Sequence, residues 1–265
     1  MIYREHLIQS PTLKEKVLCI WNMKGVLKEK EQLISRLIPK GQSFLILNFG
    51  DSISLQEEEK TTTISQKEIV APIDYKSKFL LQEGEVNLLG ISFLGDGLFH
   101  FLSNPIEDLG FEVPTKCKKV IEGFRNSYKG DSFTESSMNI KQFLVQSFQS
   151  FSPDRIDRFI QLIHETNGTE NINSICDQLS LNIRYVQLQF KKRIGISPKR
   201  YAKIIRFNHF LDQVLSEDKA DWMQIVADLN YHDQSHLIHE FRQLTNLSPS
   251  QLFEARDSLY HRYME

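Results

Sequence analysis

The chain has 265 residues, of which 40% are hydrophobic and 25% are charged, and its formal net charge is −2. This length and apolar content allow a sizeable core and two domains. No apolar run reaches the ~18 residues that span a membrane, and the N-terminus MIYREHLIQS lacks the apolar region of a signal peptide. We therefore expect a cytoplasmic protein with no membrane contact.

The cysteines and the charge distribution narrow the class of protein further. Cys19, Cys117 and Cys176 are scattered and form no CxxC, which predicts a reducing compartment without disulfides. We interpret Cys176 as a small buried residue. The net charge taken alone argues against nucleic acid, but binding to phosphates requires only that one face of the protein be basic.

Residues 1–112 are predicted to form a β-rich sensor or dimerisation domain. β-prone runs occupy 17–26, 43–49, 60–66, 76–82 and 85–93, and turn-forming segments separate them. Many short strands with regular turns are typical of a small barrel or sandwich, such as a cupin-like or jelly-roll domain. Only His6 and His100 fall in this domain, and no HxH pair occurs, so the usual ligands of a cupin metalloenzyme are missing. We predict no metal, no cofactor and no enzymatic activity.

Six aromatic residues of this domain allow two interpretations. They can line an apolar pocket for a small-molecule effector, or they can fill the core, as aromatic side chains commonly do. The six are Trp21, Phe44, Phe79, Phe93, Phe99 and Phe101.

Residues 113–151 are predicted to be a helical linker. Apolar residues recur there at spacings of three and four, which is the period of an amphipathic helix. They include Val120, Phe124, Ile140, Phe143, Leu144, Phe148 and Phe151. Two alternatives are evenly balanced: the apolar stripe pairs with a second subunit in a homodimer, or it packs on the β domain.

Residues 152–265 are predicted to be an all-α domain that contains two similar helical units. In the first, the run 182–206 has Asn182 as a helix cap, Val186 and Phe190 on an inward face, and Gly195 as the helix end. Ser197-Pro198 then starts a longer helix. No acidic residue occurs from Gln178 to Leu211, which is the charge pattern of a phosphate-facing surface.

The same pattern returns about fifty residues later. The run DQSHLIHEFRQLTNLSPSQL, residues 233–252, aligns with residues 182–201. Asp233 aligns with Asn182, Phe241 with Phe190, Asn246 with Gly195, and Ser248-Pro249 with Ser197-Pro198. Two helix-turn-helix units in tandem, at about 171–194 and 221–245, follow from this repeat.

On these residues, the region from Asp154 to Arg256 resembles the C-terminal domain of the AraC/XylS family of bacterial transcription regulators. The resemblance implies an α+β protein with an N-terminal β-barrel or cupin-like domain, a helical linker and two helix-turn-helix units. Such units place their recognition helices in successive major grooves of double-stranded promoter DNA. RNA polymerase is a further partner that the family implies. Residues 38–52 and 88–109 resemble the family's sensor region, with Leu94-Gly95-Asp96-Gly97 where the family has a proline-containing turn.

The resemblance also implies which side chains contact base edges. In the first unit they are Arg184, Gln187 and Leu188, and in the second they are Gln234, Ser235, His236 and His239. Arginine pairs with guanine, glutamine pairs with adenine, and an apolar side chain contacts the thymine methyl group. Leu188 and His239 both stand where the family usually has arginine.

Six basic residues beside these helices are predicted to contact phosphate, with some of them remaining solvated. They are Lys191, Lys192, Arg193, Lys199, Arg200 and Lys203.

Besides an interaction protein whose helical middle recruits a partner, two other functions are weighed against a DNA-binding regulator. His232, His236 and His239 have a spacing that places imidazoles on one side of a helix, as a zinc site requires, but a fourth ligand is missing. A ligand-binding or enzymatic cupin-like protein with an accessory DNA-binding domain is the second alternative. It lacks paired carboxylates, a nucleophile triad or a metal set.

Overall fold

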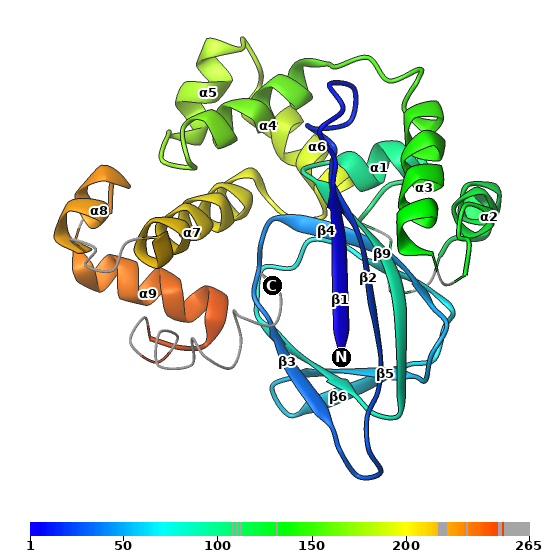
Figure 1. The fold of residues 1–265 in the computed structure, drawn as a ribbon. Helices are drawn as coiled ribbons and strands as arrows, with labels where there is room; N and C mark the ends of the chain where they lie inside the picture. Colours follow the sequence, from blue (N-terminus) through cyan, green and yellow to red (C-terminus); the bar gives the residue numbers. More distant parts are fainter. Residues whose placement is uncertain are drawn as a thin grey trace.

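The computed structural model describes residues 1–107, 109, 111, 113–130, 132–216, 222–231, 233–248 and 251 (Figure 1). Two antiparallel β-sheets with covering helices form the N-terminal part, and a bundle of short helices forms the C-terminal part. The predicted α+β architecture is therefore confirmed. No helix in the described ranges has the length and apolarity needed to cross a membrane.

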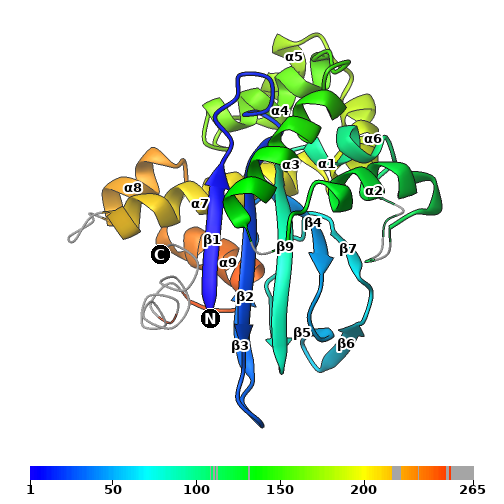
Figure 2. The ribbon, with the colours of Figure 1, turned by 45° about the vertical axis from the view of Figure 1, so that its right-hand side comes forward.

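The strands form two sheets. Sheet A contains, in spatial order, β1 (Ile2–Leu7), β2 (Val17–Val26), β9 (Glu85–Leu94), β4 (Gln42–Asn48) and β7 (Glu68–Ala71) (Figure 2). Sheet B contains β3 (Leu33–Leu37), β8 (Lys78–Gln82), β5 (Ile53–Glu57) and β6 (Lys60–Ile64). Among the described residues the ladders end at the edge strands of each sheet, so of the expected barrel or sandwich the structure has the two separate sheets and no closed barrel.

Burial on both faces explains the apolar runs in the middle of sheet A. Ile20 and Ile91 are fully buried in the core under the helices. Trp21 and Leu88 belong to a separate cluster, which reaches sheet B through Ile46. Because successive side chains alternate between the faces of a strand, a strand covered on both sides is apolar almost throughout.

Trp21 also requires a glycine on the neighbouring strand. Its register partner is Gly90, and a Cβ atom at that position would lie 2.2 Å from Cζ2 of the indole ring. The ring thus occupies the space above the bare backbone, which is a common use of glycine inside a strand.

The six aromatic residues weighed as an effector pocket lie in different parts of the molecule. Phe93 and Phe101 belong to the core beneath the helices, and Trp21 and Phe44 belong to the second cluster. Phe79 lies under the Arg36 guanidinium, whose carbon is 4.4 Å from the ring centroid. Phe99 packs at the edge of the core beneath the helices, with its ring centroid 5.5 Å from the guanidinium carbon of Arg193 in the C-terminal part. The set therefore does not line a single pocket.

The helices after β9 cover the outer face of sheet A. They are α1 (Gly97–Leu102), the 3-10 turn η1 (Thr115–Cys117), α2 (Lys118–Asn126) and α3 (Phe133–Ser147). Ile140, Leu144 and Phe148 are buried in the same core as the strands. This part of the linker's apolar stripe accordingly packs on the β domain, one of the two alternatives.

The C-terminal part contains six helices in the described ranges. They are α4 (Arg155–Glu165), α5 (Ile172–Gln178), α6 (Ile183–Ile194), α7 (Pro198–Ser216), α8 (Trp222–Asp228) and α9 (Gln234–Thr245). Figure 1 shows α4 to α6 above one end of the sheets and α7 to α9 beside β3. Tyr201, Phe207 and Phe210 of α7 are buried and join both helical groups into one core. Cys176 is buried in that core, as expected.

Candidate nucleic-acid interface

The two helix-turn-helix units repeat their end structures. Asn182 and Asp233 cap α6 and α9, each accepting a hydrogen bond from a backbone N–H of the first turn. Gly195 and Asn246 end these helices in the left-handed region, with φ of 92° and 57°. The alignment made from the sequence therefore corresponds to equivalent local structure. Pro249 and the residues after Gln251 lie outside the described residues, so this part of the alignment remains a prediction.

The first recognition helix, α6, presents the predicted base-contacting residues to solvent. Val186 and Phe190 are fully buried, and Phe190 packs edge-on against Phe159 of α4. Arg184, Gln187 and Leu188 are exposed, and Leu188 keeps 67% of its surface accessible. Single exposed apolar side chains are common on protein surfaces, so the base contact assigned to Leu188 stays a prediction.

The second recognition helix, α9, is arranged in the same way. Gln234, Ser235 and His239 are exposed, while His236 is half-buried, with its ring 5.5 Å from that of Tyr231. The Nε2 atom of His239 lies 2.9 Å from the side-chain amide nitrogen of Gln243. His232, which the zinc alternative requires, lies outside the described residues.

The predicted phosphate-contacting residues differ in their exposure and in whether a carboxylate of the protein already balances their charge. Lys191, Lys192, Lys199 and Arg200 are exposed. Lys191 Nζ lies 3.2 Å from a Glu107 carboxylate oxygen, and the Arg200 guanidinium carbon lies 5.1 Å from the Tyr75 ring centroid. Lys203 is half-buried and pairs with Glu240 at 3.1 Å, so part of its charge is already balanced.

Arg193 does not meet the expectation of a phosphate contact. Only 9% of it is exposed, and its Nη2 atom lies 2.5 Å from Asp154 while Nη1 lies 3.5 Å from Asp96. The prediction is therefore corrected: two carboxylates hold this guanidinium at the boundary with the β domain. Arg193 comes seven residues after Val186 and three after Phe190, which places it on the inward face of the helix. The basic run KKR in the sequence predicted a phosphate contact instead.

Arg193 belongs to a buried ionic cluster that sequence reasoning missed. Lys16 Nζ donates to Asp96 at 2.5 Å and also to Asp157 of α4. His100 Nε2 lies 3.1 Å from Asp96 and 3.7 Å from Asp157. The side chains of the cluster thus come from the β domain and from α4 and α6 of the helical domain.

The cluster shifts the pKa values of its members. Burial favours neutral Asp96, but the hydrogen bond from His100 and the charge of Lys16 outweigh it and lower the pKa of Asp96 to about 2. The pKa of Asp157 is also lowered, because contacts with His100 and Lys16 overcome its burial. Burial lowers the pKa of His100, yet its bonds to Asp157 and Asp96 prevail and raise it.

Asp96, His100 and Asp157 have the spacing of a metal site, with ligand atoms all within 4.8 Å of one another. The Lys16 ammonium lies between the two carboxylates and already supplies the positive charge there. A metal ion would have to displace this buried lysine. The donor set therefore does not fit a resident metal.

A second buried charge joins α7 to α9. Glu240 is 1% exposed and accepts three hydrogen bonds from Arg206: Nη2 donates to its two oxygens at 2.9 and 2.7 Å, and Nε donates at 3.2 Å. The Tyr231 hydroxyl donates to the same carboxylate at 3.0 Å. Lys203 of α7 also pairs with Glu240, at 3.1 Å. Glu240 therefore attaches the second recognition helix to the long helix between the units.

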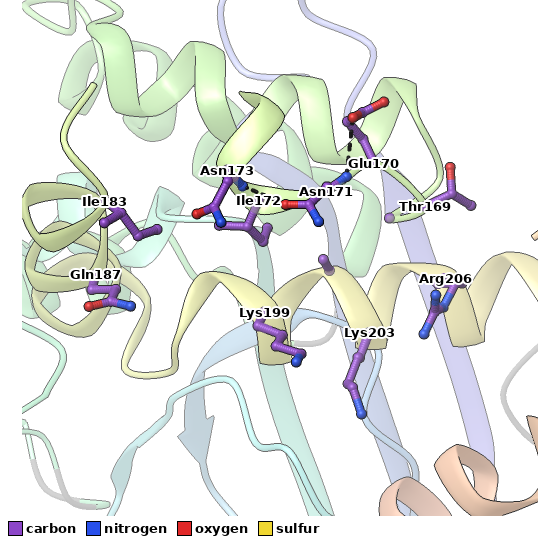
Figure 3. Close-up of a pocket in the computed structure, with 12 residues that line it drawn as sticks. Thr169, Glu170, Asn171, Ile172, Asn173, Ile183, Gln187, Lys199, Lys203 and Arg206 are labelled. Atoms are coloured by element: carbon purple, nitrogen blue, oxygen red, sulfur yellow. Dashed lines mark hydrogen bonds between the residues drawn. The ribbon is translucent and has the colours of Figure 1, made fainter. Parts of the chain in front are cut away.

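A hollow of about 440 Å³ lies beside the first recognition helix. Figure 3 shows Lys199, Lys203 and Arg206 along α7 on one side, with residues 169–173 at the start of α5 opposite them. Gln187 of α6 closes one end. One wall of the hollow is thus basic, and one end is formed by a predicted base-contacting residue.

Residues 175–255 match a family model described as a helix-turn-helix domain. The chain is 29% identical over 126 residues to the HTH-type transcriptional activator RhaS of Escherichia coli O1:K1, a match that covers 47% of this chain and 45% of RhaS. The chain thus spans about half the length of this curated relative.

Two solved structures align with most of the chain at low TM-scores. ToxT from Vibrio cholerae O395 has a TM-score of 0.46 and 12% identity, with 91% of this chain and 99% of ToxT covered. The AraC-like transcriptional activator CuxR has a TM-score of 0.25 and 11% identity, with 79% and 86% covered. The duplicated helical units and the matched model together identify the C-terminal part of this chain as a helix-turn-helix domain of the AraC/XylS type.

Proposed function

We propose that this protein regulates transcription by binding promoter DNA with α6 and α9 in successive major grooves. The observation that carries this proposal is the repeated geometry of the two helices. Each is packed through one apolar face, is capped at both ends and leaves a polar face exposed. An exposed, rigidly held helix fits the major groove of B-form DNA.

The exposed side chains supply a different chemistry in each groove. In the first, Arg184 pairs with guanine, Gln187 pairs with adenine, and Leu188 contacts a thymine methyl group. In the second, Gln234 is the principal base-contacting residue, and Ser235 and His236 bind nearby bases or phosphates. His239 makes a weaker contact than arginine would, because an imidazole offers fewer N–H donors than the fork of a guanidinium.

Phosphate binding is assigned to Lys191, Lys192, Lys199 and Arg200, which remain exposed. Lys203 contributes less, because Glu240 balances its charge. The hollow beside Gln187 lies between the first unit and the connecting helix α7, and it can receive a sugar-phosphate strand next to the first major groove. Its lysine-bearing wall supports that use.

We further propose that the β domain modulates DNA binding, either through a small-molecule effector or through a second copy of the chain. Contact with RNA polymerase would complete its action at a promoter. The protein would work in the cytoplasm and without catalysis. The alternative of a ligand-binding or enzymatic cupin-like protein gains no support from the aromatic residues, since they do not share one pocket.

Selection from a random DNA library with the full-length protein tests this proposal. We expect enrichment of two half-sites about one helical turn, or ~10 base pairs, apart. Affinity for the selected site should fall steeply between low and high salt, because several phosphate contacts release counterions. Failure to enrich any sequence, or a single contiguous half-site, would contradict two-groove reading.

A further inference from the structure

The β domain contacts the last turn of the first recognition helix. The backbone N–H of Ile106 donates to the carbonyl oxygen of Lys192 at 2.7 Å. The last four carbonyl groups of a helix have no partner within the helix, so a donor from outside completes the hydrogen bonding there. Ile106 itself is buried, with 3% of its surface exposed, which fixes the donor in place.

The β domain makes an equivalent contact with the second recognition helix. The backbone N–H and the Oγ hydroxyl of Ser77 donate to the carbonyl oxygens of Leu244 and Thr245, both at 2.8 Å. The Arg36 guanidinium donates to the Thr245 carbonyl oxygen, also at 2.8 Å. A cation at a helix C-terminus also interacts favourably with the helix dipole. One domain therefore holds the same end of both recognition helices.

Apolar packing supports the second contact. Ile73, in the segment between β7 and β8, is 5% exposed and belongs to the hydrophobic core of the helical domain. Tyr75 lies between α7 and α9, with its ring under Arg200 and its hydroxyl 3.5 Å from Gln243. This segment, residues 72–77, is thus part of the packed helical domain as well as a connection between strands.

The contacts leave the proposed base-reading faces open. Arg184 and Leu188 of α6, and Gln234 and Ser235 of α9, are all exposed while both helix C-termini are held. If the docked β domain masked DNA binding, it would cover these residues. Its position at the opposite ends of the helices instead suits an element that sets their relative position.

We propose that Ser77 and Arg36 are positioning residues for DNA reading: through the last turn of α9 they fix the second recognition helix relative to the first, and so set the half-site spacing that the protein prefers. This inference rests on the proposed function. It adds a role for the β domain that requires neither an effector nor a second subunit.

The test uses the full-length double variant Arg36→Ala/Ser77→Ala. The matched control is Arg4→Ala/Ser65→Ala, which changes an exposed arginine and an exposed serine of the β domain. Binding is measured on the selected two-half-site DNA, on versions with one or two base pairs added or removed, and on DNA with the second half-site scrambled. Thermal unfolding confirms that each variant is folded.

We expect about a tenfold loss of affinity at the preferred spacing, which corresponds to ~1.4 kcal/mol. The dependence on spacing should flatten, while binding to DNA with a scrambled second half-site should equal that of the unchanged protein. A general weakening of the fold would lower all these affinities alike. If the double variant does not fold, Ser77→Ala, which removes only one hydroxyl, is compared with Ser65→Ala in the same assay.

Two results would overturn the positioning role. One is a folded variant with an unaltered spacing profile, and the other is a uniform gain of affinity, which would identify the contact as a mask. If the proposed function itself were wrong, the unchanged protein would show no dependence on two half-sites. That result differs from both of the results above.

Discussion

The guanidinium of Arg193 lies 3.5 Å from the carboxylate of Asp96, so the first recognition helix is ion-paired with the β domain across a buried boundary. Asp96 is completely buried and also accepts a hydrogen bond from Lys16. A buried charge has lost its hydration, so it is tolerated only when a buried charge of opposite sign lies beside it. The pairing makes the β domain and α6 dependent on each other.

Replacing Asp96 should therefore destabilise the whole protein. We expect Asp96→Ala to lower the free energy of unfolding by about 3–5 kcal/mol, because Lys16 then keeps only Asp157, and Arg193 only the exposed Asp154, as a counter-charge. Urea unfolding of the full chain measures the change, with Glu29→Ala as a control at an exposed acidic residue. Equal stability of the two variants would show that the cluster contributes nothing.

The same cluster predicts how stability depends on pH. His100 faces Asp96, Asp157 and Lys16, with Arg193 and Asp154 beyond them and the rings of Phe99 and Phe151 against it. Its pKa in the folded protein is raised above the ordinary value of 6.5. A group with a raised pKa stabilises the fold fully below its unfolded value and loses that effect as the pH rises through the folded value.

We therefore expect the unchanged protein to lose more stability as the pH rises above 6.5 than the variant His100→Gln, which cannot titrate there. Asp96 acts in the opposite direction: its stabilisation is present above the ordinary pKa of 3.8 and is lost as the pH falls toward about 2. Thermal unfolding across this pH range checks both. Parallel curves for the two proteins above pH 6 would contradict the role of His100.

The helical units were predictable because their signals are local. A cap residue, apolar residues at spacings of three and four, and a glycine or asparagine at the helix end all lie within one short run. The long central strands β2, β4 and β9 were also predictable, since burial on both faces makes them apolar throughout. The short strand β1, with the sequence IYREHL, was not predicted, because a polar edge strand carries little apolar alternation.

The ionic cluster could not be predicted from the sequence. Lys16 is 80 residues from Asp96 and 141 residues from Asp157, and no local pattern connects them. Ile73 likewise lies in a stretch typical of a turn, yet its side chain enters the core of another domain. Arg193 is the exception, because its spacing from Phe190 already indicates the inward face.

Base reading gives the next prediction. Gln187→Ala and Gln234→Ala should each relax the preference for one base and cost about 1–3 kcal/mol on the preferred site. Lys192→Ala serves as the contrast, since loss of a phosphate contact weakens binding to all sequences and lowers the salt slope by ~1. Library selection with each variant makes the comparison. Unchanged base preferences in both glutamine variants would mean that other side chains read the DNA.

Glu240 and Gln189 allow a comparison between the two copies, because they occupy equivalent positions one residue before Phe241 and Phe190. Glu240 is buried with Arg206 and Lys203 around it, whereas Gln189 is only half-buried and accepts a bond from Arg193 at 3.1 Å. Glu240→Ala should cost about 3–5 kcal/mol of stability, because it leaves two cations of α7 unpaired. Gln189→Ala should cost about 1 kcal/mol, the effect of one hydrogen bond.

DNA binding should separate the two variants as well. Loss of Glu240 frees α9 from α7, so the contribution of the second half-site should fall while the first is still read. Chemical unfolding, followed by binding to DNA with either half-site scrambled, measures both effects. Equal penalties at the two half-sites, or a Glu240→Ala variant as stable as Gln189→Ala, would show that this charge network does not hold the second recognition helix.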